Sequence, residues 1–164
     1  MRWSDYFWGF HLAVRGFTDH AVGVLSEARH QAAIRRDRDT EPEHVLLALA
    51  MARRQPAAMI ALERLGVDLR RDLDQLAALL RCPTGASSDK PRFSPETKQL
   101  LAHARLMAKQ LGQNYIGTEH LVLGLLGSDS CPAADYLRAR GATKDRFLEE
   151  LIGLLNKSWR CPKL

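Results

Sequence analysis

Residues 114–126 read Asn-Tyr-Ile-Gly-Thr-Glu-His-Leu-Val-Leu-Gly-Leu-Leu, and this stretch decides the fold because the chain holds a second version of it. Residues 38–50, which lie 76 positions earlier, read Arg-Asp-Thr-Glu-Pro-Glu-His-Val-Leu-Leu-Ala-Leu-Ala. Each version places a Glu-His pair, Glu43-His44 or Glu119-His120, directly before an apolar run with helical spacing. The chain therefore contains an internal duplication.

The match extends outward in both directions from this stretch. With the same shift of 76, residues 17–58 align with residues 93–134 without a gap and share twelve identities over 42 positions. Phe17 falls on Phe93, and a one-residue slip further along brings Gly66 onto Gly141. This period is longer than that of a solenoid repeat, so the sequence indicates one subdomain present twice.

Each copy has the pattern of four helices. Thr18 and Ser94 are N-cap candidates for the first helix, and the second begins after residues 41–42 or 117–118. The third runs from Pro56 to Gly66 or from Pro132 to Gly141, a proline-first, glycine-last pattern. The fourth is expected to start at Asp68 or Thr143. We predict an all-α fold, a pseudo-twofold pair of four-helix motifs with about eight helices and no strand.

The domain boundaries follow from the duplication. We expect a duplicated body at residues 17–155, made of repeats 17–80 and 93–155 joined by a linker at 81–92, with a basic tail at 156–164. Residues 1–16 form an aromatic N-terminal extension in which Trp3, Phe7, Phe10 and Val14 recur at helical spacing. Packing on the body, docking on a partner and anchoring at a membrane surface are three open interpretations of this extra helix.

Composition excludes several classes of protein. Apolar residues make up 46% and charged residues 26% of the 164-residue chain, which is globular composition. No apolar run approaches the roughly 20 residues of a membrane span. The net charge of +5 lies outside the repeats, which carry net −1 (nine basic, ten acidic) and 0 (seven of each), and this argues against nucleic-acid binding. Three cysteines without a C-x-x-C pair favour a reducing compartment, hence a cytoplasmic protein.

No catalytic arrangement is visible. The chain lacks a phosphate-binding loop, a dinucleotide fingerprint and a metalloprotease motif. We find no paired acid and base, no metal-ligand set and no activated nucleophile, so we predict a non-enzymatic protein without metal or cofactor. His44 and His120 are interpreted as core or capping residues.

The Tyr-Ile-Gly-Thr-Glu-His string, with Phe93-Ser94-Pro95 some twenty positions earlier, resembles the N-terminal domain of Clp-type AAA+ unfoldases, in particular the ClpC branch. The first copy agrees through Phe17-Thr18-Asp19 and Glu43-His44. The resemblance covers residues 17–155 and includes no ATPase module. It implies a docking module whose partners are Clp unfoldase or peptidase components, protein substrates or adaptors.

In the ClpC branch this domain also recognises phosphorylated arginine. Carried over residue by residue, the resemblance implies that Glu119 acts with Phe93, Ser94 and Lys98, and that Glu43 acts with Phe17 and Thr18. A carboxylate can pair with a guanidinium through two hydrogen bonds, and a phosphate can sit on the N–H groups at a helix start.

The first copy departs from the family pattern. Asp39 and Glu41 replace residues of the Asn-Tyr-Ile-Gly-Thr segment and would repel a phosphate, and Val22 stands where the second copy has Lys98. We therefore expect the second copy to hold the better anion site. Two other functions stay open: a structural accessory of the Clp protease ring, and a peptide or small-ligand sensor uncoupled from proteolysis.

Overall fold

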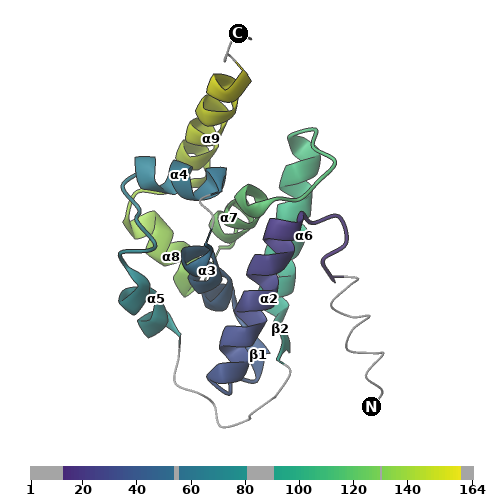
Figure 1. Ribbon diagram of the computed structural model, residues 1–164, viewed down its shortest axis with the longest axis vertical. Coiled ribbons are helices and arrows are strands. Elements are labelled where there is room, and N and C mark those ends of the chain that lie inside the picture. Colours follow the sequence, from purple (N-terminus) through teal and green to yellow (C-terminus); the bar gives the residue numbers. More distant parts are fainter. Residues whose placement is uncertain (1–12, 54–55, 81–90, 130, 160–164) are drawn as a thin grey trace.

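The computed structural model describes residues 13–53, 56–80, 91–129 and 131–159, with side chains as far as residue 155. Over these residues the chain forms eight helices and two very short strands (Figure 1). In chain order they are α2 (Asp19–Ile34), β1 (Asp39–Thr40), α3 (Pro42–Met51), α4 (Ala57–Arg64), α5 (Leu73–Leu79), β2 (Arg92–Phe93), α6 (Pro95–Gln110), α7 (Thr118–Leu126), α8 (Pro132–Ala139) and α9 (Lys144–Trp159). The predicted all-α fold is confirmed.

Several expectations concern residues that lie outside the described ranges. These are the extension up to residue 12, most of the linker, the end of the basic tail, and the thiols of Cys82 and Cys161.

Local sequence signals set most helix starts. The Thr18 hydroxyl accepts a hydrogen bond from the Ala21 N–H at 3.3 Å, and the Ser94 hydroxyl accepts one from the Thr97 N–H at 3.1 Å. Both residues are therefore N-caps, as predicted.

The fourth helix of the first copy begins later than predicted, at Leu73 and not just after Asp68. The Asp68 carboxylate accepts hydrogen bonds from the N–H groups of Arg70 and Arg71, both at 3.1 Å. This side-chain turn offers the backbone an alternative to the helix and delays its start.

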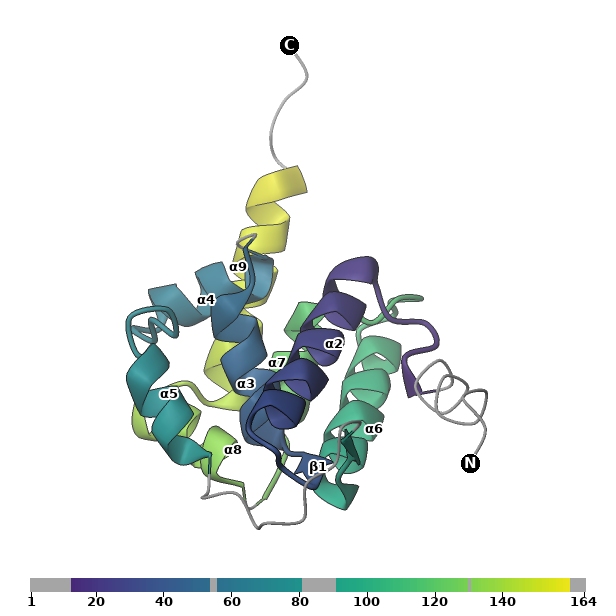
Figure 2. The ribbon, with the colours of Figure 1, turned by 60° about the horizontal axis from the view of Figure 1, so that its bottom comes forward.

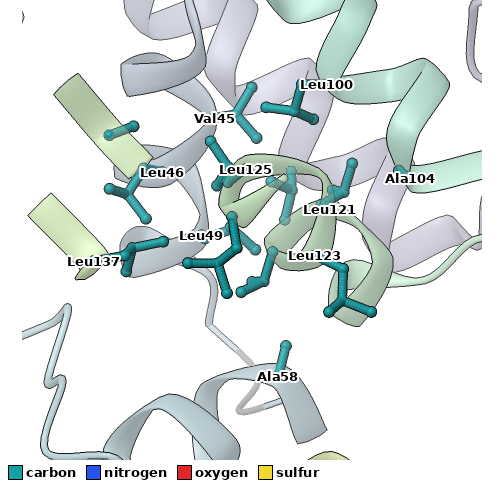
Figure 3. Close-up of a cluster of buried hydrophobic side chains, with 14 of the residues drawn as sticks. Val45, Leu46, Leu49, Ala58, Leu100, Ala104, Leu121, Leu123, Leu125 and Leu137 are labelled. Atoms are coloured by element: carbon teal, nitrogen blue, oxygen red, sulfur yellow. The ribbon is translucent and has the colours of Figure 1, made fainter. Parts of the chain in front are cut away.

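The second helix of each copy forms the centre of the molecule. α3 and α7 lie between α2 and α6 on one side and α4, α5, α8 and α9 on the other (Figure 2). Both helices are buried almost all round, which suits their nearly continuous apolar sequence. The core that they organise, drawn in Figure 3, includes Val45, Leu46 and Leu49 of α3, Leu121, Leu123 and Leu125 of α7, Leu100 and Ala104 of α6, Ala58 of α4 and Leu137 of α8.

The strands were not predicted, and they reveal how the two copies meet. β1 pairs in parallel with β2, with Thr40 opposite Phe93. A parallel bridge likewise places Phe17 opposite Ile116. Thr40 matches Ile116 and Phe93 matches Phe17 under the shift of 76 residues, so the two pairings are equivalent and are related by the pseudo-twofold symmetry. The start of each first helix therefore lies against the segment that precedes the second helix of the other copy.

Helix α7 packs very closely on α6 at one point. A Cβ atom added to Gly124 would lie 2.6 Å from the Leu100 carbonyl oxygen and 3.3 Å from the Ala104 nitrogen. Only glycine allows the two backbones to approach this closely. The first copy has Ala48 at the matching position.

Candidate functional site

The two Glu-His pairs begin the two central helices. His44 Nδ1 accepts a hydrogen bond from the Glu41 N–H at 3.0 Å, and His120 Nδ1 accepts one from the Gly117 N–H at 2.9 Å. Burial lowers the pKa of both imidazoles below the ordinary value of 6.5, so they act as neutral acceptors. The prediction that these are capping histidines of the core is confirmed.

The remaining ring nitrogens differ between the copies. His44 Nε2 lies 2.9 Å from an oxygen of Asp37. At the matching positions His120 Nε2 and Gln113 Oε1 are both buried, and neither has a hydrogen-bond partner within the described part of the chain. Buried polar atoms at the start of α7 therefore have fewer hydrogen-bond partners than their counterparts at the start of α3.

The structure does not bring Glu119 together with Phe93, Ser94 and Lys98, nor Glu43 with Phe17 and Thr18. Ser94 caps the start of α6, while Glu119 follows the loop that leaves its end. The 16 residues of α6 span about 24 Å at 1.5 Å per residue, so these groups lie at opposite ends of one helix. The crosswise pairing of the copies instead brings Phe17 and Thr18 to the start of α7, and Phe93 and Ser94 to the start of α3.

We call the first of these places the Glu119 corner, made of residues 16–19 and 115–119. The Thr18 N–H donates to the Ile116 carbonyl at 2.9 Å, and the Ile116 N–H donates to the Gly16 carbonyl at 2.9 Å. Phe17 is partly buried, and the Arg105 guanidinium lies 5.0 Å from its ring centroid. This guanidinium also donates to the Ala13 carbonyl, so Arg105 connects α6 to the segment that leads into the corner.

The Glu119 carboxylate is the group in this corner that is able to bind a ligand. Its side chain is 16% exposed, and no donor among the described residues hydrogen-bonds to it. Its near neighbour, His120 Nδ1 at 3.6 Å, already accepts from the Gly117 N–H and so donates no hydrogen bond to the carboxylate. A Cβ added to Gly117 would lie 2.4 Å from both carboxylate oxygens. The carboxylate therefore folds back over the glycine and keeps its hydrogen-bonding capacity.

The start of α2 completes the Glu119 corner. Thr18 uses its hydroxyl for the Ala21 N–H and its own N–H for the Ile116 carbonyl. The other two N–H groups of the first turn, those of Asp19 and His20, have no acceptor within the helix. A carboxylate for a cation and helix-start N–H groups for an anion thus belong to the same corner.

The second place, the Ser94 corner, is made of residues 92–98 and 39–43. Here Glu43 is only 7% exposed and accepts a hydrogen bond from the Ala133 N–H at 3.3 Å, at the start of α8. The carboxylate thus caps a helix of the other copy. Lys98 is exposed one turn beyond Ser94, while Phe93 is buried.

Glu41 also occupies the Ser94 corner. Burial is the largest effect on its carboxylate and raises the pKa of Glu41; the Ser94 side chain lowers this pKa, and the nearby charges of Glu96, Glu43 and Asp39 raise it further. The Ser94 hydroxyl donates to Thr97 Oγ1 at 3.2 Å. The capping box suggested by the sequence at Thr40 is not formed, because Glu41 is the N-cap and His44 reaches back to it.

The negative charge of Glu41 was recognisable from the sequence as unfavourable to a phosphate, whereas the importance of Gly117 for Glu119 was not. The signal that could have found it is that these two residues occupy the same position of the two copies. Within the described ranges, no group of three or more His, Cys, Asp or Glu side chains is placed to hold a metal ion. Over the same ranges, every helix is too short or too polar to cross a membrane.

Two crosswise-paired copies of a four-helix motif, each with a Glu-His pair opening its central helix, define a duplicated helical domain. The model of the Clp repeat (R) N-terminal domain family matches residues 16–140, and this chain belongs to that family. The expected family is thereby confirmed.

Individual members of this family and solved N-domain structures are also similar to the chain. The chain is 30% identical over 142 residues to the chloroplastic chaperone protein ClpC1 of Oryza sativa subsp. japonica, an alignment that covers 87% of this chain and 15% of that protein. The fold is similar to the Hsp104 N-terminal domain from Candida albicans, with a TM-score of 0.70, 22% identity and coverage of 85% and 91% of the two chains. It is also similar to a ClpV N-domain in complex with a VipB peptide, with a TM-score of 0.67, 19% identity and coverage of 87% and 91%.

Proposed function

We propose that this chain is a non-enzymatic docking module that binds protein substrates or adaptors for a Clp machine. We further propose that the Glu119 corner receives a phosphorylated arginine of the bound protein. Membership of the Clp repeat family supports the first statement, as does the peptide bound by the structurally similar ClpV N-domain. The single observation that carries the second is the Glu119 carboxylate, held over Gly117 with no donor from the described residues.

The chemistry of the corner suits such a ligand. The guanidinium is planar and presents a fork of donors that matches a carboxylate, so Glu119 can accept two hydrogen bonds from it. The phosphate then meets the N–H groups of Asp19 and His20 at the positive end of α2. Asp19 is exposed at this helix start, so the negative charge nearest the phosphate is screened by solvent.

Calorimetric titration of the chain with free phosphoarginine, and then with a phosphoarginine peptide, tests this function. We expect Glu119→Gln to weaken binding by about 1.5–3 kcal/mol, the usual range for a hydrogen bond to a charged group, which is roughly 10- to 150-fold in affinity. Glu43→Gln is the matched control, and it should leave affinity unchanged because Glu43 caps α8. Equal losses in the two variants would contradict the assignment.

A pull-down from native lysate tests the docking role independently. We expect the wild-type chain to recover the unfoldase or its substrates, and Glu119→Gln to recover less of the substrates. Recovery of the peptidase ring alone, unchanged by Glu119→Gln, would favour a structural accessory. Recovery of neither component would favour a sensor uncoupled from proteolysis.

A further inference from the structure

The two corners differ at one position that controls both of them. Gly117 and Glu41 are the N-cap residues of α7 and α3 and match under the shift of 76. At Gly117, a Cβ atom would lie 2.4 Å from the Glu119 carboxylate oxygens. With any residue other than glycine here, the end of the flexible Glu119 side chain would have to move from this position. The Gly117 backbone φ of −94° is accessible to all residues. Glycine is favoured here only because a side chain would collide with the Glu119 carboxylate.

Glu41 has the opposite effect in the Ser94 corner. Here the residue at the N-cap carries a side chain, and the Glu43 carboxylate does not fold back over it but accepts the Ala133 N–H at 3.3 Å. Glu41 follows Thr40, whose carbonyl accepts the Ser94 N–H at 3.2 Å, so Glu41 lies beside the residue that caps α6, and Ser94 lowers the pKa of its carboxylate. An anion belonging to the chain thus stands at the helix start where an external phosphate would bind.

The charges around the Ser94 corner strengthen this exclusion. The charges of Glu96, Glu43 and Asp39 all raise the pKa of the Glu41 carboxylate, and the corner also holds two exposed cations, Arg92 and Lys98. A phosphate brought to Ser94 would therefore meet four carboxylates and two cations, and this excess of negative charge disfavours its binding. At the Glu119 corner the position of Glu41 is taken by Gly117, and the local negative charges come from Glu119 and Asp19.

We propose that the two corners differ in phosphoarginine binding because they have different residues at the matching positions 41 and 117. Gly117 leaves the Glu119 corner open to one phosphoarginine. Glu41 closes the Ser94 corner by acting as its internal ligand. The chain therefore binds one such ligand despite its pseudo-twofold symmetry. This inference rests on the proposed function, and it adds the number of sites and the residue that determines them.

Exchanging the two residues tests the inference. Calorimetric titration of the wild-type chain with phosphoarginine should give a stoichiometry of one. Gly117→Glu, which installs the first-copy residue, should weaken this binding about tenfold or more by displacing Glu119. Glu41→Gly should leave the first site intact and add a second, weaker one, because the helix start at Ser94 loses the neighbouring carboxylate while Glu43 still contacts Ala133. Ser94→Ala should not affect wild-type binding, and it should abolish the added site in the Glu41→Gly background.

The outcomes separate the two proposals. If the wild type binds no phosphoarginine, the proposed ligand itself is wrong. If it binds two equivalents, or if Ser94→Ala removes its single site, the proposed function survives and the inferred inequality is wrong. A folded Glu41→Gly variant with one site also refutes the inference. Thermal unfolding shows which variants are folded, and should Glu41→Gly fail to fold, Glu41→Ala removes the same carboxylate and Gly117→Glu still tests the open corner.

Discussion

Glu43 and Glu119 occupy matching positions, and we expect their replacement by alanine to affect stability very differently. The Glu43 carboxylate is buried and accepts the Ala133 N–H at 3.3 Å, which joins the start of α3 to the start of α8 across 90 positions of sequence. In Glu43→Ala this buried N–H loses its acceptor, at a cost of about 1–3 kcal/mol. Loss of a negative charge at a helix start adds about 0.3–1 kcal/mol.

Relief of the repulsion between Glu43 and Glu41 offsets part of this loss. We therefore expect Glu43→Ala to lower the free energy of unfolding by about 2 kcal/mol, which for a domain of this size corresponds to about 4–8 °C in Tm. Glu119→Ala removes a carboxylate that has no donor within the described residues, so it should change stability by no more than about 0.5 kcal/mol.

Thermal and urea unfolding followed by circular dichroism measure both variants. Glu43→Gln is the control, because it keeps an oxygen acceptor for Ala133 and loses only the charge, at a cost below about 1 kcal/mol. Equal shifts in Tm for Glu43→Ala and Glu119→Ala would refute the reasoning. It would mean that Glu119 supports a helix in the same way and is not held free for a ligand.

Two further predictions concern stability alone. Gly124→Ala should lower the free energy of unfolding by about 1–3 kcal/mol, because the new Cβ would lie 2.6 Å from the Leu100 carbonyl oxygen; thermal unfolding checks this, and an unchanged Tm would show that α6 and α7 can separate without cost. Burial lowers the pKa of His44 and His120 below 6.5, so the unfolded chain binds protons that the folded chain does not. Stability should hold above about pH 6.5 and fall as the pH drops below it, with a slope of up to about 1.4 kcal/mol per pH unit for each histidine; urea titrations from pH 7.5 to 5 check this, and a double His→Gln variant should flatten the profile.

Features determined by nearby residues were predictable from the sequence. Thr18 and Ser94 cap their helices as expected, because an N-cap needs only a hydroxyl and the N–H three residues later. The buried histidines were also interpreted correctly from their place beside an apolar run. The start of α5 was misplaced because the Asp68 turn, a purely local alternative, prevails over the leucine periodicity.

The partners of each site residue could not be found in the same way. Phe17 and Ile116 are 99 positions apart, and their pairing depends on how the two copies dock. Periodicity within one copy carries no information on that docking, so the sequence predicted Glu119 beside the Ser94 and Lys98 of its own copy. The role of Gly117 depends on an interatomic distance of 2.4 Å to a side chain that no spacing rule specifies.

The crosswise pairing of the copies also bears on how their sequences can diverge. In a homodimer of a single copy joined in this way, each corner would be built between two subunits, and symmetry would make the two corners identical. Every substitution would then appear in both at once. Covalent linkage of the copies removes that constraint, so a glutamate can stand at position 41 while glycine remains at position 117. One corner can thus be given over to holding the helices together while its counterpart keeps an unengaged carboxylate.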